Sequence, residues 1–192
     1  QLDFSAELAQ VAAKNPDAVY VFYPGGLGVS FVRQYKQAGL AGKVPLLSTS
    51  TTDGSTLPAQ KDDALGVISG TFWGPDFKNP ASQQFVAEFE KKYGRIPSQY
   101  AAQSYDAAQL LDSAIAKVKG NLSDKKAFLA ALKAADFKSV RGSFKFNNNN
   151  FPIEDMHVFE VATDPKGRYS LKTIATPLKD HEDAYHTQCP LK

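Results

Sequence analysis

The chain has 192 residues, with 22 Lys and Arg, 20 Asp and Glu, and a formal net charge of +2 at pH 7. A balance this close to neutral, without a block of basic residues, excludes the electrostatic footprint of a nucleic-acid-binding protein, so no nucleic-acid partner is expected. No apolar run reaches the ~20 residues that a membrane-spanning helix requires. A single cysteine, Cys189, excludes an internal disulfide and leaves a free thiol or a bond to a partner outside the chain.

The first 73 residues are predicted to alternate between helices and strands. Residues 18–23 form an uncharged run of β-branched and aromatic residues, which is typical of a strand buried on both faces. The other segments predict, in chain order, a helix over 6–14, a helix over 27–38, and strands over 44–47 and 66–73. This order is typical of a parallel sheet in an α/β fold.

The pattern changes after Gly74 and Pro75. Residues 139–146 alternate weakly and predict two short strands around Arg141 and Gly142, followed by a turn at 147–150. The remaining predicted elements are helices over 81–93 and 124–134, a clear helix with an apolar stripe from Ala107 to Val118, a hairpin of strands 156–162 and 169–175, and a polar tail over 178–192.

Pro24, Gly25 and Gly26 end the first predicted strand, and a helix follows at once. A strand that turns into a helix at glycines presents backbone N–H groups at the carboxyl edge of a parallel sheet, where such sheets bind ligands. A dinucleotide fingerprint would need glycine in place of Phe31, and a hydrolase elbow would need glycine in place of Val32. We therefore interpret the turn as a close approach of the backbone to a neighbour or a ligand.

The titratable residues form no catalytic or metal-binding pattern. No Ser, Thr or Cys stands beside an obvious base, and no carboxylate pair stands out for acid–base chemistry. His181 and His186 flank Glu182 and Asp183 without ligand spacing on a predicted helix, so a solvated tail is the favoured interpretation. We expect no enzyme activity, no metal and no cofactor.

Two further segments are candidate ligand contacts. The first follows the second predicted strand and therefore falls on the same edge of the sheet as the glycine turn. Residues 48–56 are rich in Ser and Thr and can hydrogen-bond a polar ligand without placing a charge against it, although a surface loop of turn-forming residues explains the composition equally well. Tyr100, Gln103 and Tyr105 lie at the start of the clearest predicted helix. A tyrosine there suits an aromatic or amphipathic ligand, and core packing is the alternative for Tyr105.

Five segments occur in a specific order and spacing: DFSAEL at 3–8, PDAVYV at 16–21, FVRQYKQAGL at 31–40, FVAEFEKKYG at 85–94 and AAQSYDAA at 101–108. Together they resemble the periplasmic solute-binding proteins of the branched-chain amino-acid (Leu/Ile/Val-binding) type, which serve ATP-driven importers. The resemblance covers nearly the whole chain but only the second half of a typical member. It implies a type I periplasmic-binding-protein fold, in which hinge crossovers join two Rossmann-like parallel-sheet lobes of an α/β protein.

The resemblance also implies a division of the chain. Residues 1–73 would be the later part of ligand-binding lobe 2, residues 74–150 the returning part of lobe 1, and residues 151–192 the final crossover strands and C-terminal tail. The hinge would consist of Phe72, Trp73, Gly74 and Pro75. We expect a missing N-terminal half on a separate or nicked chain, a periplasmic location with the signal peptide outside this chain, and a membrane permease as partner.

Members that bind amino acids carry an acidic residue at the position of Ser50, where it pairs with the ligand's ammonium group, and an aromatic residue at the position of Gly25 or Gly26. Both departures argue against an α-amino acid, because an unpaired buried ammonium is costly. An aromatic carboxylate, such as a hydroxybenzoate or a phenylpropenoate, is the favoured ligand. The alternatives are branched-chain or other amino-acid or amide binding, and a ligand-sensing receptor domain of the same fold. The implied ligand contacts are Gly25, Gly26, Leu27, Ser50, Thr51, Tyr100 and Gln103.

Overall fold

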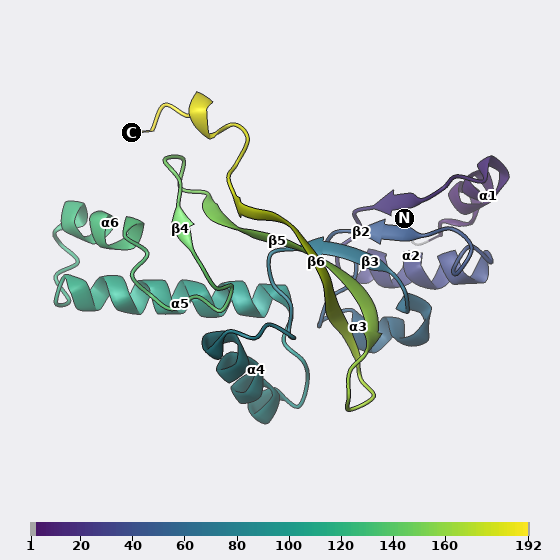
Figure 1. The fold of residues 1–192 in the computed structure, drawn as a ribbon, viewed down its shortest axis with the longest axis horizontal. Helices are drawn as coiled ribbons and strands as arrows, with labels where there is room; N and C mark the ends of the chain where they lie inside the picture. The colour runs from purple at the N-terminus through teal and green to yellow at the C-terminus, as the bar shows by residue number, and fades with distance from the viewer. Residues whose placement is uncertain (1–2, 192) are drawn as a thin grey trace.

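A mixed sheet of six strands runs through the protein and joins its two ends (Figure 1). The computed structural model describes residues 3–191. Strands β1, β2 and β3 pair in parallel, β5 runs antiparallel to β3, and both β4 and β6 pair with β5. The strands are β1 (Val19–Val21), β2 (Leu46–Ser48), β3 (Ile68–Thr71), β4 (Lys145–Phe146), β5 (Pro152–Thr163) and β6 (Tyr169–His181). The predicted α/β fold with a parallel sheet is confirmed.

The helices fall into two groups at opposite ends of the molecule (Figure 1). Asn79 accepts the Ser82 N–H at 2.8 Å and Ser98 accepts the Ala101 N–H at 3.3 Å, which caps the first turns of two helices at one end. Beside β1–β3 lie α1 (Ser5–Lys14), α2 (Gly26–Gln37), α3 (Leu57–Gln60) and the 3₁₀ helix η1 (Lys61–Ala64). At the other end lie α4 (Pro80–Tyr93), α5 (Gln99–Lys117) and α6 (Lys125–Lys133), while the tail contains the 3₁₀ helix η2 (His186–Gln188).

Each group of helices has its own hydrophobic core. The larger core packs Leu8 of α1 and Tyr35 of α2 against Phe159 of β5, all of which are at most 2% exposed. The smaller core centres on Trp73, which packs edge-on against Phe85 of α4 with ring centroids 5.7 Å apart. Burial of such side chains contributes most of the stability of each end.

The predicted hairpin is confirmed and is longer than the sequence suggested. Strand β5 begins at Pro152 rather than at 156, and β6 continues to His181, into the segment that was expected to be an unpatterned polar tail. Glu154 pairs with His181 near the open end of the hairpin. Backbone pairing needs no apolar side chain, so hydropathy alone did not reveal the extension.

Two sequence-based predictions are wrong. Of the two strands expected over 139–146, only β4 forms, because the Val140 N–H is bound by the Asp106 side chain and the Gly142 N–H returns to the Ser139 carbonyl in a turn. The strand over 18–23 is not buried on both faces, since Tyr20 is 66% exposed.

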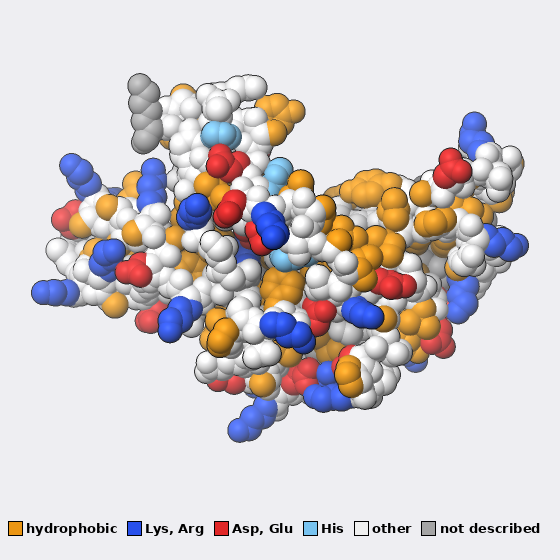
Figure 2. All heavy atoms as spheres, viewed as in Figure 1, with side chains coloured by type: hydrophobic (Ala, Val, Ile, Leu, Met, Phe, Trp, Pro, Cys, Tyr) orange, Lys and Arg blue, Asp and Glu red, His pale blue; other side chains and the backbone are white. Residues whose placement is uncertain are grey.

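The exposed side of β1 carries two aromatic residues. Tyr20 and Phe22 are 66% and 59% exposed, whereas Val21 between them is buried. Figure 2 shows hydrophobic side chains on the surface over β1 and β2. Within residues 3–191, no helix is long and apolar enough to cross a membrane.

Candidate functional site

The glycine turn after β1 packs against the loop after β2. Gly25 has a φ of +66°, and Gly25, Gly26 and Leu27 are exposed. Gly28 behind them is buried, and a Cβ at this position would lie 2.2 Å from a backbone oxygen of the turn and 3.0 Å from Thr51 Cγ2. No larger residue fits without moving the backbone, so Gly28 brings the turn and the loop into contact.

The loop after β2 is anchored in the protein interior. Thr51 is fully buried, its hydroxyl oxygen accepts the Tyr23 N–H at 3.1 Å, and its carbonyl accepts hydrogen bonds from Thr56 and Gln60. The interpretation of 48–56 as an ordinary surface loop is therefore wrong. Ser50 differs from Thr51 because it is partly exposed and adopts a φ of +57°. The structure thus presents Ser50 at the surface of the loop and holds Thr51 behind it.

The start of α5 closes the third side of this site. A Cβ on Gly54 would lie 2.5 Å from the Pro97 carbonyl oxygen, so the loop and the linker before α5 are in close contact. Gln99, the first residue of α5, donates from Nε2 to Ser50 Oγ at 2.9 Å, and its Oε1 accepts a hydrogen bond from Thr71. The buried Gln99 carboxamide thereby joins the loop to the end of β3.

The two tyrosines near the start of α5 have different environments. Tyr100 is 46% exposed, and Gln103 on the same helix is exposed as well. Tyr105 packs against Phe85 with ring centroids 4.8 Å apart, which supports core packing as the explanation for that residue. An exposed tyrosine ring can stack on a flat ligand.

The loop at Ser50 joins the other two segments, because it contacts the turn at 25–28 on one side and the start of α5 on the other. Sequence reasoning missed Gly54, Thr71 and Gln99, because nothing in the local pattern distinguishes them from ordinary loop, strand and helix residues. Over residues 3–191, no group of three or more His, Cys, Asp and Glu side chains is arranged to hold a metal ion.

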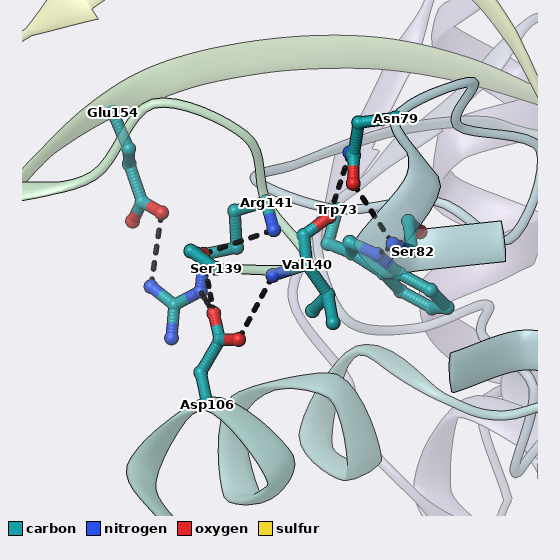
Figure 3. A network of polar contacts seen from close by, with 8 residues as sticks. All are labelled: Trp73, Asn79, Ser82, Asp106, Ser139, Val140, Arg141 and Glu154. Carbon is teal, nitrogen blue, oxygen red and sulfur yellow. Dashed lines mark hydrogen bonds and ion pairs between the residues drawn. The ribbon is translucent and has the colours of Figure 1, made fainter. Parts of the chain in front are cut away.

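The segment after β3 connects the two ends of the molecule. Trp73 is 1% exposed and donates from Nε1 to Ser82 Oγ at 3.0 Å (Figure 3). A Cβ on Gly74 would lie 2.2 Å from the Phe159 ring, so this glycine lets the chain cross close to β5. Phe72 lies under the Arg141 guanidinium at 4.5 Å, and Pro75 follows with partial exposure.

A buried group of charges stands beside this crossover (Figure 3). Arg141 lies 3.2 Å from Asp106 of α5 and 2.9 Å from Glu154 of β5, and the three side chains are at most 7% exposed. Desolvation raises the pKa of Asp106, against hydrogen bonds from Ser139 and the Val140 N–H and the Arg141 charge. Desolvation also raises the pKa of Glu154, although Arg141 opposes it. The arginine links α5 to β5 at the crossover.

A family model described as periplasmic binding protein matches residues 1–167. The chain belongs to this family. Its members and structural neighbours are solute-binding proteins rather than enzymes, in agreement with the search for catalytic groups. The resemblance drawn from the five sequence segments is confirmed.

Three relatives are 25–30% identical to this member of the family over the aligned residues. A Leu/Ile/Val-binding protein homolog from Brucella melitensis is 27% identical over 181 residues, which are 91% of this chain and 46% of the relative. A solute-binding protein of an ABC transporter from R. palustris, solved with benzoate, is 30% identical with a TM-score of 0.81, over 95% of this chain and 51% of that one.

A second solved solute-binding protein, from Rhodopseudomonas palustris BisB5 in complex with 3,4-dihydroxybenzoic acid, is 25% identical. Its TM-score is 0.85, over 95% of this chain and 50% of that protein. The chain thus spans about half the length of the relatives that it matches.

Proposed function

We propose that this chain is the second half of an extracytoplasmic solute-binding protein that captures an aromatic carboxylate for an ATP-driven importer. The observation that carries the ligand class is the loop at Ser50, where a hydroxyl is partly exposed while the carboxylate of Asp53 in the same loop is only 1% exposed. An aromatic ring stacks on Tyr100, and its polar substituent meets Ser50. The carboxylate is held by the part of the protein that this chain lacks.

The chain divides at the crossover after β3. Residues 1–73, with β1–β3, belong to the ligand-binding lobe 2; residues 74–150, with α4–α6, to lobe 1; and residues 151–192 to the final crossing. Phe72 to Pro75 act as a hinge segment. In support of this division, each end has a separate hydrophobic core, and β5 pairs with strands of both ends. Ligand that contacts both lobes stabilises the closed form, which docks on a membrane permease.

The absent N-terminal half covers the apolar side of β1. Tyr20 and Phe22 expose their rings on one side of an edge strand, an arrangement that favours an additional layer of the same protein. In the complete protein, both rings should be buried, and the backbone amides of β1 should exchange their hydrogens more slowly. Hydrogen exchange of these amides, compared between this chain alone and the full-length protein, measures the effect. Equal exchange rates in the two would contradict the proposed packing.

Binding of the ligand is tested by thermal unfolding of the full-length protein. Benzoate and 4-hydroxybenzoate should raise the unfolding midpoint where leucine does not; a ligand at a hundred times its Kd adds about 2.7 kcal/mol of stability. Tyr100→Ala should reduce the shift, whereas Tyr185→Ala, which truncates an exposed tyrosine in the tail, should leave it unchanged. A larger shift with leucine than with either aromatic acid would overturn the ligand class.

An α-amino acid is the second candidate, and one observation favours it. Asp53 lies in the same loop, and its Oδ2 has no hydrogen-bond partner among residues 3–191. A ligand ammonium would supply one. Asp53 is only 1% exposed, however, and its Oδ1 accepts from both the N–H and the hydroxyl of Ser55. Leucine binding that is lost in Asp53→Asn would establish this candidate.

A further inference from the structure

The Gln99 carboxamide is held at both ends. Its Nε2 donates to Ser50 Oγ at 2.9 Å, and its Oε1 accepts the Thr71 hydroxyl. Gln99 is 5% exposed and Thr71 is 9% exposed, so neither group is free to exchange these bonds for water. In these two bonds the amide NH₂ faces Ser50, and the amide oxygen faces the end of β3.

We propose that Gln99 is a positioning residue that fixes the Ser50 hydroxyl as a hydrogen-bond donor toward the ligand, so that the site selects ligands with an acceptor atom at that end. The inference rests on the proposed binding of aromatic carboxylates and names the substituent that they carry. That substituent is an acceptor such as a phenolic oxygen opposite the carboxylate.

The preference for a ligand with an acceptor atom follows from the proton and lone pairs of the Ser50 hydroxyl. A serine hydroxyl has one proton and two lone pairs, and an amide NH₂ can only donate. Because Gln99 occupies one lone pair, the Ser50 proton cannot point at Gln99. No acceptor for that proton is found among residues 3–191. The proton is therefore available to an atom of the ligand.

The loop holds Ser50 in one orientation. On one side, the Thr49 hydroxyl donates to the Gly70 carbonyl at 2.9 Å; on the other, the Thr51 hydroxyl accepts the Tyr23 N–H at 3.1 Å. With one neighbour bound to β3 and the other to the turn after β1, Ser50 retains its φ of +57°. A hydroxyl held in this way offers its proton to an acceptor atom of the ligand.

The test uses isothermal calorimetry of the full-length protein with benzoate, 4-hydroxybenzoate and 4-aminobenzoate. The phenol offers a good acceptor, whereas the aromatic amine mainly donates. The wild type should therefore bind 4-hydroxybenzoate more tightly than 4-aminobenzoate. In Gln99→Glu, the Ser50 proton turns to the new carboxylate and exposes lone pairs to the ligand. The preference should shift about tenfold or more toward 4-aminobenzoate.

Two further variants separate positioning from general damage. In Ser50→Ala, the Kd values of the two substituted benzoates should lie within about threefold of the Kd of benzoate, because the hydroxyl that distinguishes the substituents is gone. Gln109→Glu introduces the same charge at an exposed position of α5 and should retain the wild-type ratio of the Kd values for 4-hydroxybenzoate and 4-aminobenzoate. A loss of stability alone would weaken all three ligands together without changing their order.

An unchanged ratio in a folded Gln99→Glu protein overturns the inference and leaves the proposed function intact. If Gln99→Glu does not fold, Ser50→Ala decides: a wild-type ratio in that variant overturns the inference, and a lost preference supports it. A wild type that binds leucine and none of the three benzoates overturns both the proposed ligand class and this inference.

Discussion

The buried arginine at the crossover provides a direct test of the structure. In Arg141→Met, an apolar chain of similar length replaces the guanidinium, which leaves Asp106 and Glu154 buried without a counter-charge. Breaking a buried ion pair from one side costs ~3–5 kcal/mol. The ring contacts of the guanidinium, at 4.5 Å from Phe72 and 5.1 Å from Phe144, are lost as well. We therefore expect a loss at the upper end of this range at pH 7.

The loss should depend on pH in a known direction. Burial already raises the pKa of both carboxyls above their ordinary values of 3.8 for Asp106 and 4.5 for Glu154. Without Arg141, the folded variant retains protons that the unfolded chain releases. Its stability then falls as pH rises from these ordinary values through the raised pKa of each group. The deficit relative to wild type should consequently be smaller at pH 5 than at pH 7.

Urea unfolding of the full-length protein at pH 5 and pH 7 measures both effects. Lys117→Met is the matched control, because it removes a 3.8 Å pair with Asp136 in which both side chains are about half exposed or more. Such a pair contributes at most ~1 kcal/mol. An Arg141→Met deficit no larger than that of the control, or one that is equal at both pH values, would refute the reasoning.

Three further outcomes are expected. Gly28→Ala should cost ~1–3 kcal/mol in urea unfolding and weaken ligand binding, because its Cβ would lie 2.2 Å from the Tyr23 carbonyl oxygen and 3.0 Å from Thr51 Cγ2. An unchanged Kd would show that turn and loop can separate without harm. Desolvation lowers the pKa of His157 below 6.5, against the charges of acidic neighbours, so the contribution of His157 to stability should rise with pH up to about 6.5. The stability of His157→Gln relative to wild type should therefore change over this pH range, and identical pH profiles would contradict the assignment. The hydrogen bond from Arg168 lowers the pKa of Glu90, so the Glu90–Arg168 pair should stabilise the hairpin at pH 7 and lose this effect as pH falls below 4.5. Glu90→Gln should therefore cost about 1 kcal/mol of stability at pH 7 and nothing in acid. An equal cost at both pH values would exclude the pair as its cause.

The sequence by itself determined the local elements and the family. Periodic apolar residues and glycines at turns act over a few residues, and the helices and the hairpin formed close to where these signals predicted. The close approach of backbone expected at the glycine turn occurs at Gly28, whereas a Cβ at Gly25 or Gly26 would meet nothing within 4 Å.

Only the tertiary structure decided which distant groups meet. Gln99 contacts Ser50 from 49 residues away, and Arg141 reaches Asp106 and Glu154 on two different elements. An amide or a charge carries no periodic signal that names its partner. Tertiary structure also decided the exposure of Tyr20, because a hydrophobic strand sequence indicates that a face should be covered without indicating which part of the protein covers it.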